Sequence, residues 1–305
     1  MGKYQEPISM QTALDCAIRE NEGKSGGYKV KNGTIYCNYM SETEWDDYLG
    51  EMDETHKKQY KDGGGGELYP GKYPPKMASF GSSSRFIYEL SKNISGFKFE
   101  EKLDTKVGGV ANIDGFIKTN GKYIYIEAKR REIYGASHAN EKVKVVYEDV
   151  YNTIQKLVNN FNFKMYGEKD EEGYKKCTFK FRKKDVTDFE DVTYFDLKQL
   201  ICHFLGITYD IAKHPVKNAK VTFLYLLYNP NKVEDKIDEK YREKVMNRYQ
   251  EVVSFIKDKK DAFKAIFDAV LQYQTETHKL EKPKIDFKFK LVDQDHYKSE
   301  LTDIK

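Results

Sequence analysis

Apolar residues recur along this chain with a period that switches repeatedly between those of helices and strands. Serines from Ser82 offer N-cap hydroxyls to a helix over residues 85–90, and strands are predicted after it at 97–103, 112–118 and 122–129. Further helices are predicted at 8–19, 141–160, 195–205, 237–256 and 261–273, with a buried strand at 220–228 and an edge strand from residue 284. The pattern predicts an α/β (α+β) fold with a mixed sheet, in the order helix, three strands, helix, strand, with helical N- and C-terminal additions.

Glycine and proline break this pattern between Asp62 and Pro75. Such a segment cannot hold a regular element, and no strand leads into the glycine run as a phosphate-binding loop would require. We therefore expect an N-terminal helical subregion with its connector at 1–79, a core at 80–230, and a C-terminal helical extension with a tail strand at 231–305. The strongly charged residues at about 166–192 are expected to form a surface insertion in the core, with a hairpin at 177–181.

Charge is nearly balanced, with 52 Lys and Arg against 49 Asp and Glu, so the total does not by itself indicate a nucleic-acid partner. Basic residues gather at 129–131 and 175–184 and acidic residues at 42–47 and 185–196, which allows a locally positive face. The four cysteines lack the paired spacing of structural zinc sites. No apolar run has the length of a membrane span and no secretory signal is evident, so we expect a soluble cytoplasmic protein.

The most informative segment is the pair of predicted strands on either side of Asn120-Gly121. This dipeptide between two apolar runs is the strongest short-range signal of a two-residue hairpin turn. Counting outward from the turn places Asp114 opposite Glu127, and because side chains alternate between faces, Lys129 projects from the same side as both acids. The opposite face is expected to bury Ile113, Ile117, Ile124 and Ile126.

Two carboxylates facing each other across strands repel, so Asp114 and Glu127 need a positive partner. Mg²⁺ fits this need, because it is typically held by one or two carboxylates together with water and a substrate phosphate. Lys129 can bridge the acids in the empty site, and it can orient water or stabilise charge on a phosphate during hydrolysis. The competing interpretation is an ordinary cross-strand salt bridge on a solvent face.

Asp114, the triplet Glu127-Ala128-Lys129 and the order of elements resemble the PD-(D/E)xK nuclease superfamily. The segments 81–89 and 108–115 narrow the likeness to bacterial restriction endonucleases. The resemblance covers about residues 80–230, and Ile113 stands where that family has a proline. It implies a restriction-endonuclease-like core, in which the superfamily uses an Asp and a Glu to bind metal and a Lys to assist the attacking water.

The resemblance also implies roles for side chains outside the hairpin. Glu89, on the helix before the first strand, matches the position of an acid that completes the metal shell, and Glu100 on the first strand is its rival. Gln199 and His203 lie one turn apart on a later helix, where the superfamily often places polar residues that face the site, although packing or capping explains them nearly as well. Arg130, Arg131 and His138 follow the catalytic strand and are candidates for DNA-backbone contacts, or for a solvated loop.

These observations predict a Mg²⁺-dependent DNA endonuclease of the type II restriction kind, for which Mn²⁺ is a substitute cofactor. A double-strand cut at a symmetric site is most simply made by two related active sites, so we expect a homodimer on double-stranded DNA. Two alternatives stay open. One is a structure-specific repair, recombination or mobile-element nuclease, and the other is a DNA-binding module of the same fold without catalysis.

Overall fold

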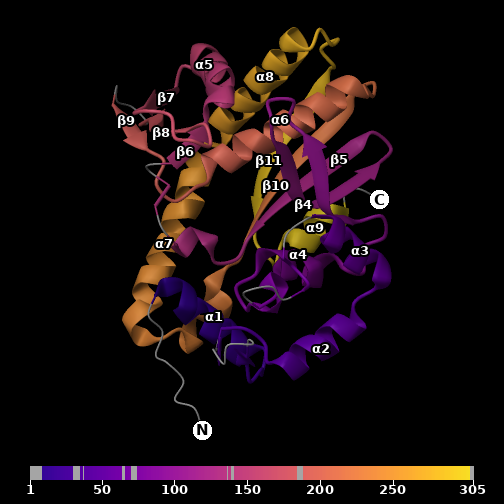
Figure 1. Ribbon diagram of the computed structural model, residues 1–305, viewed down its shortest axis with the longest axis vertical. Helices are drawn as coiled ribbons and strands as arrows, with labels where there is room; N and C mark the ends of the chain where they lie inside the picture. The colour runs from indigo at the N-terminus through magenta and orange to yellow at the C-terminus, as the bar shows by residue number, and fades with distance from the viewer. Residues whose placement is uncertain are drawn as a thin grey trace.

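The computed structural model describes residues 9–29, 35–36, 38–63, 66–69, 74–135, 137–138, 141–183 and 188–302. A mixed sheet of five strands forms its centre, and helices pack around it (Figure 1). The mixed α/β architecture that the periodicity predicts is therefore present.

The strands of the central sheet are β3 (Lys98–Asp104), β4 (Val110–Thr119), β5 (Lys122–Lys129), β10 (Ala219–Leu227) and β11 (Ile285–Val292). They are arranged in the order β11-β10-β5-β4-β3. The first three along the chain form an antiparallel meander, whereas β10 runs parallel to both β5 and β11. β10 is almost continuously apolar because it lies between two strands and is covered by helices. The edge strand predicted from residue 284 is confirmed as β11. The central sheet therefore includes residues beyond 230, where the predicted core ended.

The short helix α4 (Ser83–Ser91) and the three longest helices, α6 (Leu197–Lys213), α7 (Glu239–Asp258) and α8 (Lys260–Thr277), pack around this sheet. The Ser82 hydroxyl caps α4 by accepting from the Arg85 N–H. α6 is longer than predicted and packs closely on β3 and β4 at Gly206. A Cβ at Gly206 would lie only 2.7 Å from that of Leu103 and 3.0 Å from that of Ala111. The glycine is therefore needed for this close approach, despite its low helix propensity.

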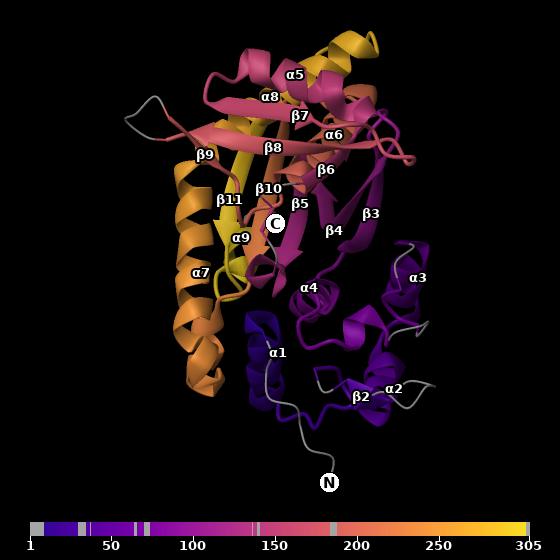
Figure 2. The same ribbon diagram turned by 60° about the vertical axis from the view of Figure 1, so that its left-hand side comes forward.

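The predicted insertion is larger than residues 166–192 and forms a second sheet. Its strands are β6 (Glu141–Lys144), β7 (Phe161–Tyr166), β8 (Tyr174–Arg182) and β9 (Phe189–Asp191), and α5 (Glu148–Leu157) accompanies them. Residues 177–181, predicted as a hairpin, lie within β8. The predicted helix over 141–160 begins only at Glu148, because residues 141–144 pair with β8 as a strand, in which Val143 is buried between two more accessible lysines. In Figure 2, β7 and β8 run crosswise over one end of the central sheet.

The N-terminal subregion lies beyond the other end of the central sheet (Figures 1 and 2). It contains α1 (Met10–Asn21), β1 (Tyr28–Lys29), β2 (Ile35–Tyr36), α2 (Glu42–Glu51) and α3 (Glu54–Gly63). Much of the predicted connector, at 64–65 and 70–73, lies outside the described residues. Short 3-10 helices occur at η1 (Lys76–Ala78), η2 (Glu132–Tyr134), η3 (Val145–Tyr147) and η4 (Pro230–Lys236).

Buried residues of the C-terminal extension belong to the same hydrophobic core as those of the central sheet, and its last described helix is α9 (Tyr297–Thr302). Phe267 of α8 stacks on Phe287 of β11 with ring centroids 3.8 Å apart, and Phe204 of α6 meets both rings edge-on. Aromatic packing of this kind stabilises a core beyond its buried area. None of the described helices is long and apolar enough to span a membrane.

Candidate active site

The hairpin of β4 and β5 has the register that its turn predicts. Asn120 and Gly121 have φ angles of 43° and 77°, both positive as this two-residue turn requires. From the turn the ladder runs outward as far as the pair Gly115 and Ile126. The four isoleucines predicted to face the core are all buried: Ile113, Ile117, Ile124 and Ile126.

The regular ladder of β4 is broken at Asp114. Its carboxylate accepts a hydrogen bond from the backbone N–H of Ala128 at 2.7 Å. By register, Glu100 on β3 and Glu127 on β5 lie at the same level as Asp114, although neither is paired with it. Glu100 has a φ of 54°, a left-handed conformation that costs a non-glycine residue roughly 1–3 kcal/mol. Three acidic residues on neighbouring strands thus lie at one level, where the backbone departs from regular pairing.

A cavity of about 410 Å³ opens beside Asp114 and Glu127. Its walls come from the connector, the start of α4, the end of β5 and the start of α6. The polar lining includes Glu67, Lys76, Ser83, Ser84, Lys129, Arg131, Glu132 and Gln199. The hydroxyl of Ser84 donates a hydrogen bond to Glu100 at 3.4 Å, which places Glu100 directly behind this lining. The end of the hairpin is therefore open to a ligand.

Lys129 joins the hairpin to α6. Its ammonium lies 2.7 Å from a carboxylate oxygen of Glu127 and donates to the side-chain oxygen of Gln199, also at 2.7 Å. The second oxygen of Glu127 lies 2.8 Å from Nε2 of His203, one helical turn beyond Gln199. The structure therefore brings Gln199 and His203 to the two central hairpin residues, where the family resemblance implied polar support.

Charge is unevenly compensated in this group. Burial, Glu127 and Glu100 raise the pKa of Asp114 well above its usual value, and burial with neighbouring carboxylates raises the pKa of Glu100 to about 7. Burial opposes ionisation of Glu127 as well, but Lys129 and His203 outweigh it and lower the pKa of Glu127 to about 2. Glu127 likewise outweighs burial and raises the pKa of Lys129. Glu127 and Lys129 are thus an ion pair, whereas Asp114 and Glu100 form no ion pair with any residue that the structure describes, and the nearby lysines offset their crowding only in part.

These acids carry the kind of ligand atom that a divalent metal ion prefers. Mg²⁺ prefers carboxylate oxygens and water, and the crowding that raises the pKa of Asp114 and Glu100 is the kind that a cation relieves. Glu100, Asp114 and Glu127 do not converge as a ready-made set within 4.8 Å. Within the described ranges, that condition is met by His138, Glu141 and Asp196. Glu141 is also paired with Lys198 at 2.6 Å, so its charge already has a protein partner.

Glu89, predicted to complete the metal shell, does not reach this cavity. It lies on α4 with its carboxylate 2.8 Å from the ammonium of Lys92 and is substantially exposed. Ser84, five residues earlier, lies on the side of the helix that faces the acids. Because five residues turn a helix by well over one revolution, Glu89 points elsewhere. Glu100, the rival candidate, is the acid that the structure brings to the group.

The three candidates for DNA contacts beyond β5 have protein partners. Arg130 is only 6% exposed and its guanidinium lies 3.0 Å from Glu22 of α1, so it is not available to a DNA backbone. Arg131 is ion-paired with the buried Asp15 but also lines the cavity. His138 is hydrogen-bonded to Glu141. Arg130 could contact DNA only if this largely buried ion pair were broken, which would be strongly destabilising, so Arg130 does not remain among the predicted contacts.

Several cavity residues escaped the sequence analysis. Glu67 and Lys76 form an ion pair at 3.1 Å, but Glu67 lies in the irregular connector and Lys76 begins the short helix η1, so no periodicity in the sequence indicates a direction for either side chain. Glu132 accepts from the Arg130 N–H at 2.9 Å and from the hydroxyl of Ser83. The only sequence signal that could have identified Glu132 as a site residue was its position three residues after Lys129, because loops at strand ends often contain functional residues.

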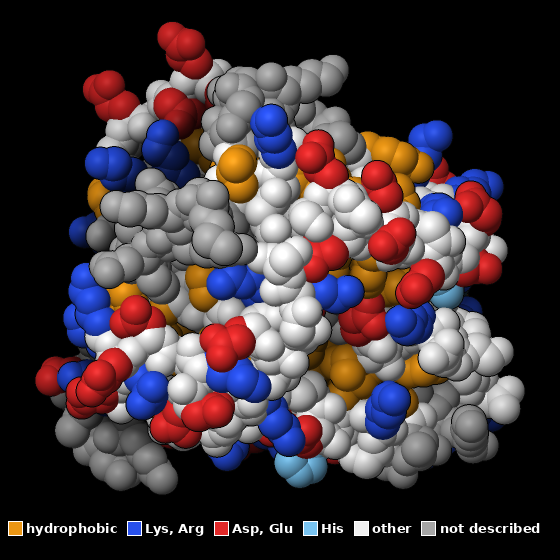
Figure 3. Space-filling view, turned by 90° about the horizontal axis from the view of Figure 1, so that it is seen from below, with side chains coloured by type: hydrophobic (Ala, Val, Ile, Leu, Met, Phe, Trp, Pro, Cys, Tyr) orange, Lys and Arg blue, Asp and Glu red, His pale blue; other side chains and the backbone are white. Residues whose placement is uncertain are grey.

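On the face shown in Figure 3, basic and acidic side chains are interspersed, so this face does not stand out as a DNA-binding surface. Comparison of the chain with protein-family models gave no match, and neither the search of curated proteins nor that of solved structures found one. Function therefore has to be argued from the residues at the end of β5.

Proposed function

We propose that this chain is a metal-dependent DNA endonuclease with a restriction-endonuclease-like core of the PD-(D/E)xK kind. The observation that carries the proposal is the contact of Lys129 with Glu127 beside Asp114, at the open end of a hairpin. An ordinary surface salt bridge is exposed and lines no cavity, whereas the side chain of Glu127 is only 3% exposed and that of Lys129 only 12%.

The order of elements supports the same core. α4, β3, β4, β5, α6 and β10 follow one another as the resemblance requires, with the second sheet inserted between β5 and α6. β10 lies parallel to β5 and next to it in the sheet. This arrangement brings the end of β5 and the start of α6 together, and the two elements supply Glu127, Lys129 and Gln199.

In this proposal Asp114 and Glu127 hold the metal ion, and Glu100 adds negative charge behind them. A bound Mg²⁺ would polarise the phosphodiester and lower the pKa of an attacking water. Lys129 is a cation held by Glu127 and Gln199, so its task is to orient the nucleophile or stabilise charge on the phosphate rather than to accept a proton. His203 keeps the other oxygen of Glu127 in place.

Cleavage of plasmid DNA tests this function. Purified protein is incubated with supercoiled and linear plasmid in the presence of Mg²⁺, Mn²⁺ or EDTA. We expect cutting with either metal and none with EDTA. Discrete fragments would support a restriction enzyme, and cutting confined to nicked, flapped or single-stranded substrates would support a structure-specific nuclease. Metal-independent DNA binding without cutting of any substrate would contradict the proposal and favour a binding module.

The third acid can be tested with a matched pair of substitutions. Glu100→Gln removes a charge next to Asp114, whereas Glu89→Gln removes the same charge from an exposed site on α4. We expect Glu100→Gln to raise the Mg²⁺ concentration for half-maximal cleavage by roughly tenfold, the effect typical of groups that support metal ligands, and Glu89→Gln to leave it unchanged. A larger effect for Glu89→Gln would restore the original assignment.

A further inference from the structure

A second cavity, of about 440 Å³, lies against the candidate active site. It is bounded by the start of β4, by α6 and by the second sheet with η3 and α5. Gln199 lines both cavities, and His203, which contacts Glu127, lines the second one. Its size lies within the range of about 300–1,000 Å³ that is usual for small-molecule sites. A ligand there would share a wall with the candidate catalytic residues.

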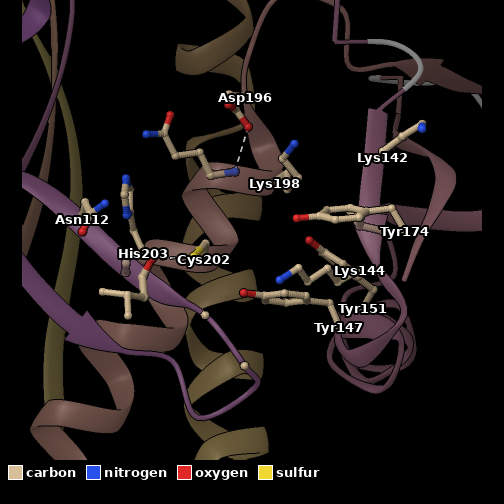
Figure 4. A pocket seen from close by; sticks show the side chains of 16 residues that line it. Asn112, Lys142, Lys144, Tyr147, Tyr151, Tyr174, Asp196, Lys198, Cys202 and His203 are labelled. Atoms are coloured by element: carbon tan, nitrogen blue, oxygen red, sulfur yellow. Dashed lines mark hydrogen bonds between the residues drawn. The ribbon is translucent and has the colours of Figure 1, made fainter. Parts of the chain in front are cut away.

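Aromatic side chains form one wall of this cavity. Figure 4 shows Tyr147, Tyr151 and Tyr174 on the side of the second sheet, across from Asn112 and His203. The rings of Tyr147 and Tyr151 are 6.3 Å apart, and Tyr147 and Tyr174 are both partly accessible. Tyrosine faces bind nucleobases by stacking, which tolerates any base because every base has a π-face.

Positive charge lies beside these rings. Lys142, Lys144 and Lys198 all line the cavity. Lys142 and Lys198 are ion-paired with acidic residues, whereas Lys144 lies 5.5 Å from the ring of Tyr174 and has no ion pair within the described part of the chain. An ammonium next to an aromatic wall suits the phosphate of a nucleotide whose base stacks there.

A buried nitrogen on the shared wall also has no hydrogen-bond partner among the described residues. His203 is only 2% exposed, and its Nδ1 makes no hydrogen bond with any described residue, although Nε2 contacts Glu127. Buried polar atoms are normally hydrogen-bonded, so such an atom on a cavity wall points to a ligand or to water.

Two exposed valines lie near the same cavity. Val110 is among its lining residues, and Val146 lies 3.8 Å from the position that a Cβ would take at Gly108, another lining residue.

We propose that this cavity binds one nucleotide of the substrate strand, turned out of the base stack next to the scissile phosphate. The proposal rests on the nuclease function proposed above. The base stacks on Tyr147 and Tyr174, and Lys144 contacts a neighbouring phosphate. A DNA strand that reaches from this cavity into the active site has to pass the wall formed by Gln199 and His203. A nucleotide bound in the cavity therefore positions the scissile phosphate at Lys129.

Binding measured in EDTA tests this proposal without relying on cleavage. A short fluorescein-labelled single strand of mixed sequence is compared with the same strand carrying abasic sites at its centre, by fluorescence anisotropy. We expect the intact strand to bind on the order of tenfold more tightly. Tyr174→Ala should abolish this preference and Tyr174→Phe should retain it, because phenylalanine keeps the stacking face. Lys144→Ala should weaken both strands alike.

Equal affinity of the wild-type protein for the two strands, or no binding of either, would overturn the proposal. A preference that survives Tyr174→Ala would also overturn it, provided that circular dichroism shows the variant folded. Free dAMP is the third probe, and competition by dAMP as strong as by the intact strand would assign the cavity to a free nucleotide instead. If the base preference holds while plasmid is never cut with Mg²⁺, the nuclease function fails and the nucleotide site stands.

Discussion

Lys129→Ala is expected to slow DNA cleavage on the order of 10²- to 10³-fold in single-turnover reactions at saturating Mg²⁺, the range typical of losing one charge-stabilising group. The ammonium of Lys129 lies 2.7 Å from both Glu127 and Gln199, so its position is held from two sides. Alanine removes the charge, leaves Gln199 without this donor and leaves Glu127 with His203 alone. The cleavage rate and the affinity for DNA in Ca²⁺ should be measured separately, and we expect the rate to change far more than the affinity.

Lys76→Ala is the matched control, because it removes the same charge from the same cavity. Lys76 pairs with Glu67 and its side chain is 63% exposed, so solvent screens its charge. We expect a rate within a few-fold of the wild type. Similar losses in the two variants would mean that the cavity needs only positive charge in general. In that case the specific role of Lys129 would have to be abandoned.

Asp114→Asn is expected to abolish cleavage and yet stabilise the metal-free protein, by about 1–2 kcal/mol at pH 8. Burial and two nearby carboxylates raise the pKa of Asp114 well above 3.8, so the folded state binds this proton more tightly than the unfolded state. As pH rises above 3.8 through the folded-state pKa, the free energy of unfolding therefore falls. Asparagine cannot ionise, but its side-chain oxygen can still accept from the Ala128 N–H.

Urea denaturation in EDTA at pH 5 and pH 8 measures this effect. The difference between Asp114→Asn and the wild type should be larger at pH 8, and Mg²⁺ should stabilise the wild type but not the variant, because only the wild type keeps the ligand. Asp104→Asn, at an exposed ion pair on β3, serves as the control and should stay within about 0.5 kcal/mol. Destabilisation of Asp114→Asn at pH 8 would show that the three acids are not crowded in the metal-free protein.

Local chemistry made much of the core predictable. Asn120-Gly121 determines the hairpin register because few other residues adopt positive φ at both turn positions, and this register brings Asp114 and Glu127 to one level. Ser82 and the apolar run of β10 act in the same way, through a helix cap and through burial on both faces. Each of these signals is contained within a few consecutive residues.

The sequence did not indicate the features of the structure that depend on contacts between distant segments. Residues 141–144 form a strand, although the helical spacing of later apolar residues suggested that the helix began there. Glu89 lies in a plausible place along the chain, but the rotation of α4 turns it away from the cavity. Arg130 looks like a surface cation in the sequence, yet it is buried and paired with Glu22, more than a hundred residues earlier.

The sequence by itself therefore determined the order of the core elements, the hairpin and the central pair Glu127 and Lys129, because periodicity and turn chemistry are local properties. Only the tertiary structure selected Glu100 over Glu89 and showed that Gln199 and His203, which the resemblance had suggested, contact Lys129 and Glu127. Those choices depend on the break in pairing at Asp114 and on how the helices rotate against the sheet. Packing of the whole chain determines the break in pairing and the rotation of the helices, and neither can be predicted from a local sequence pattern.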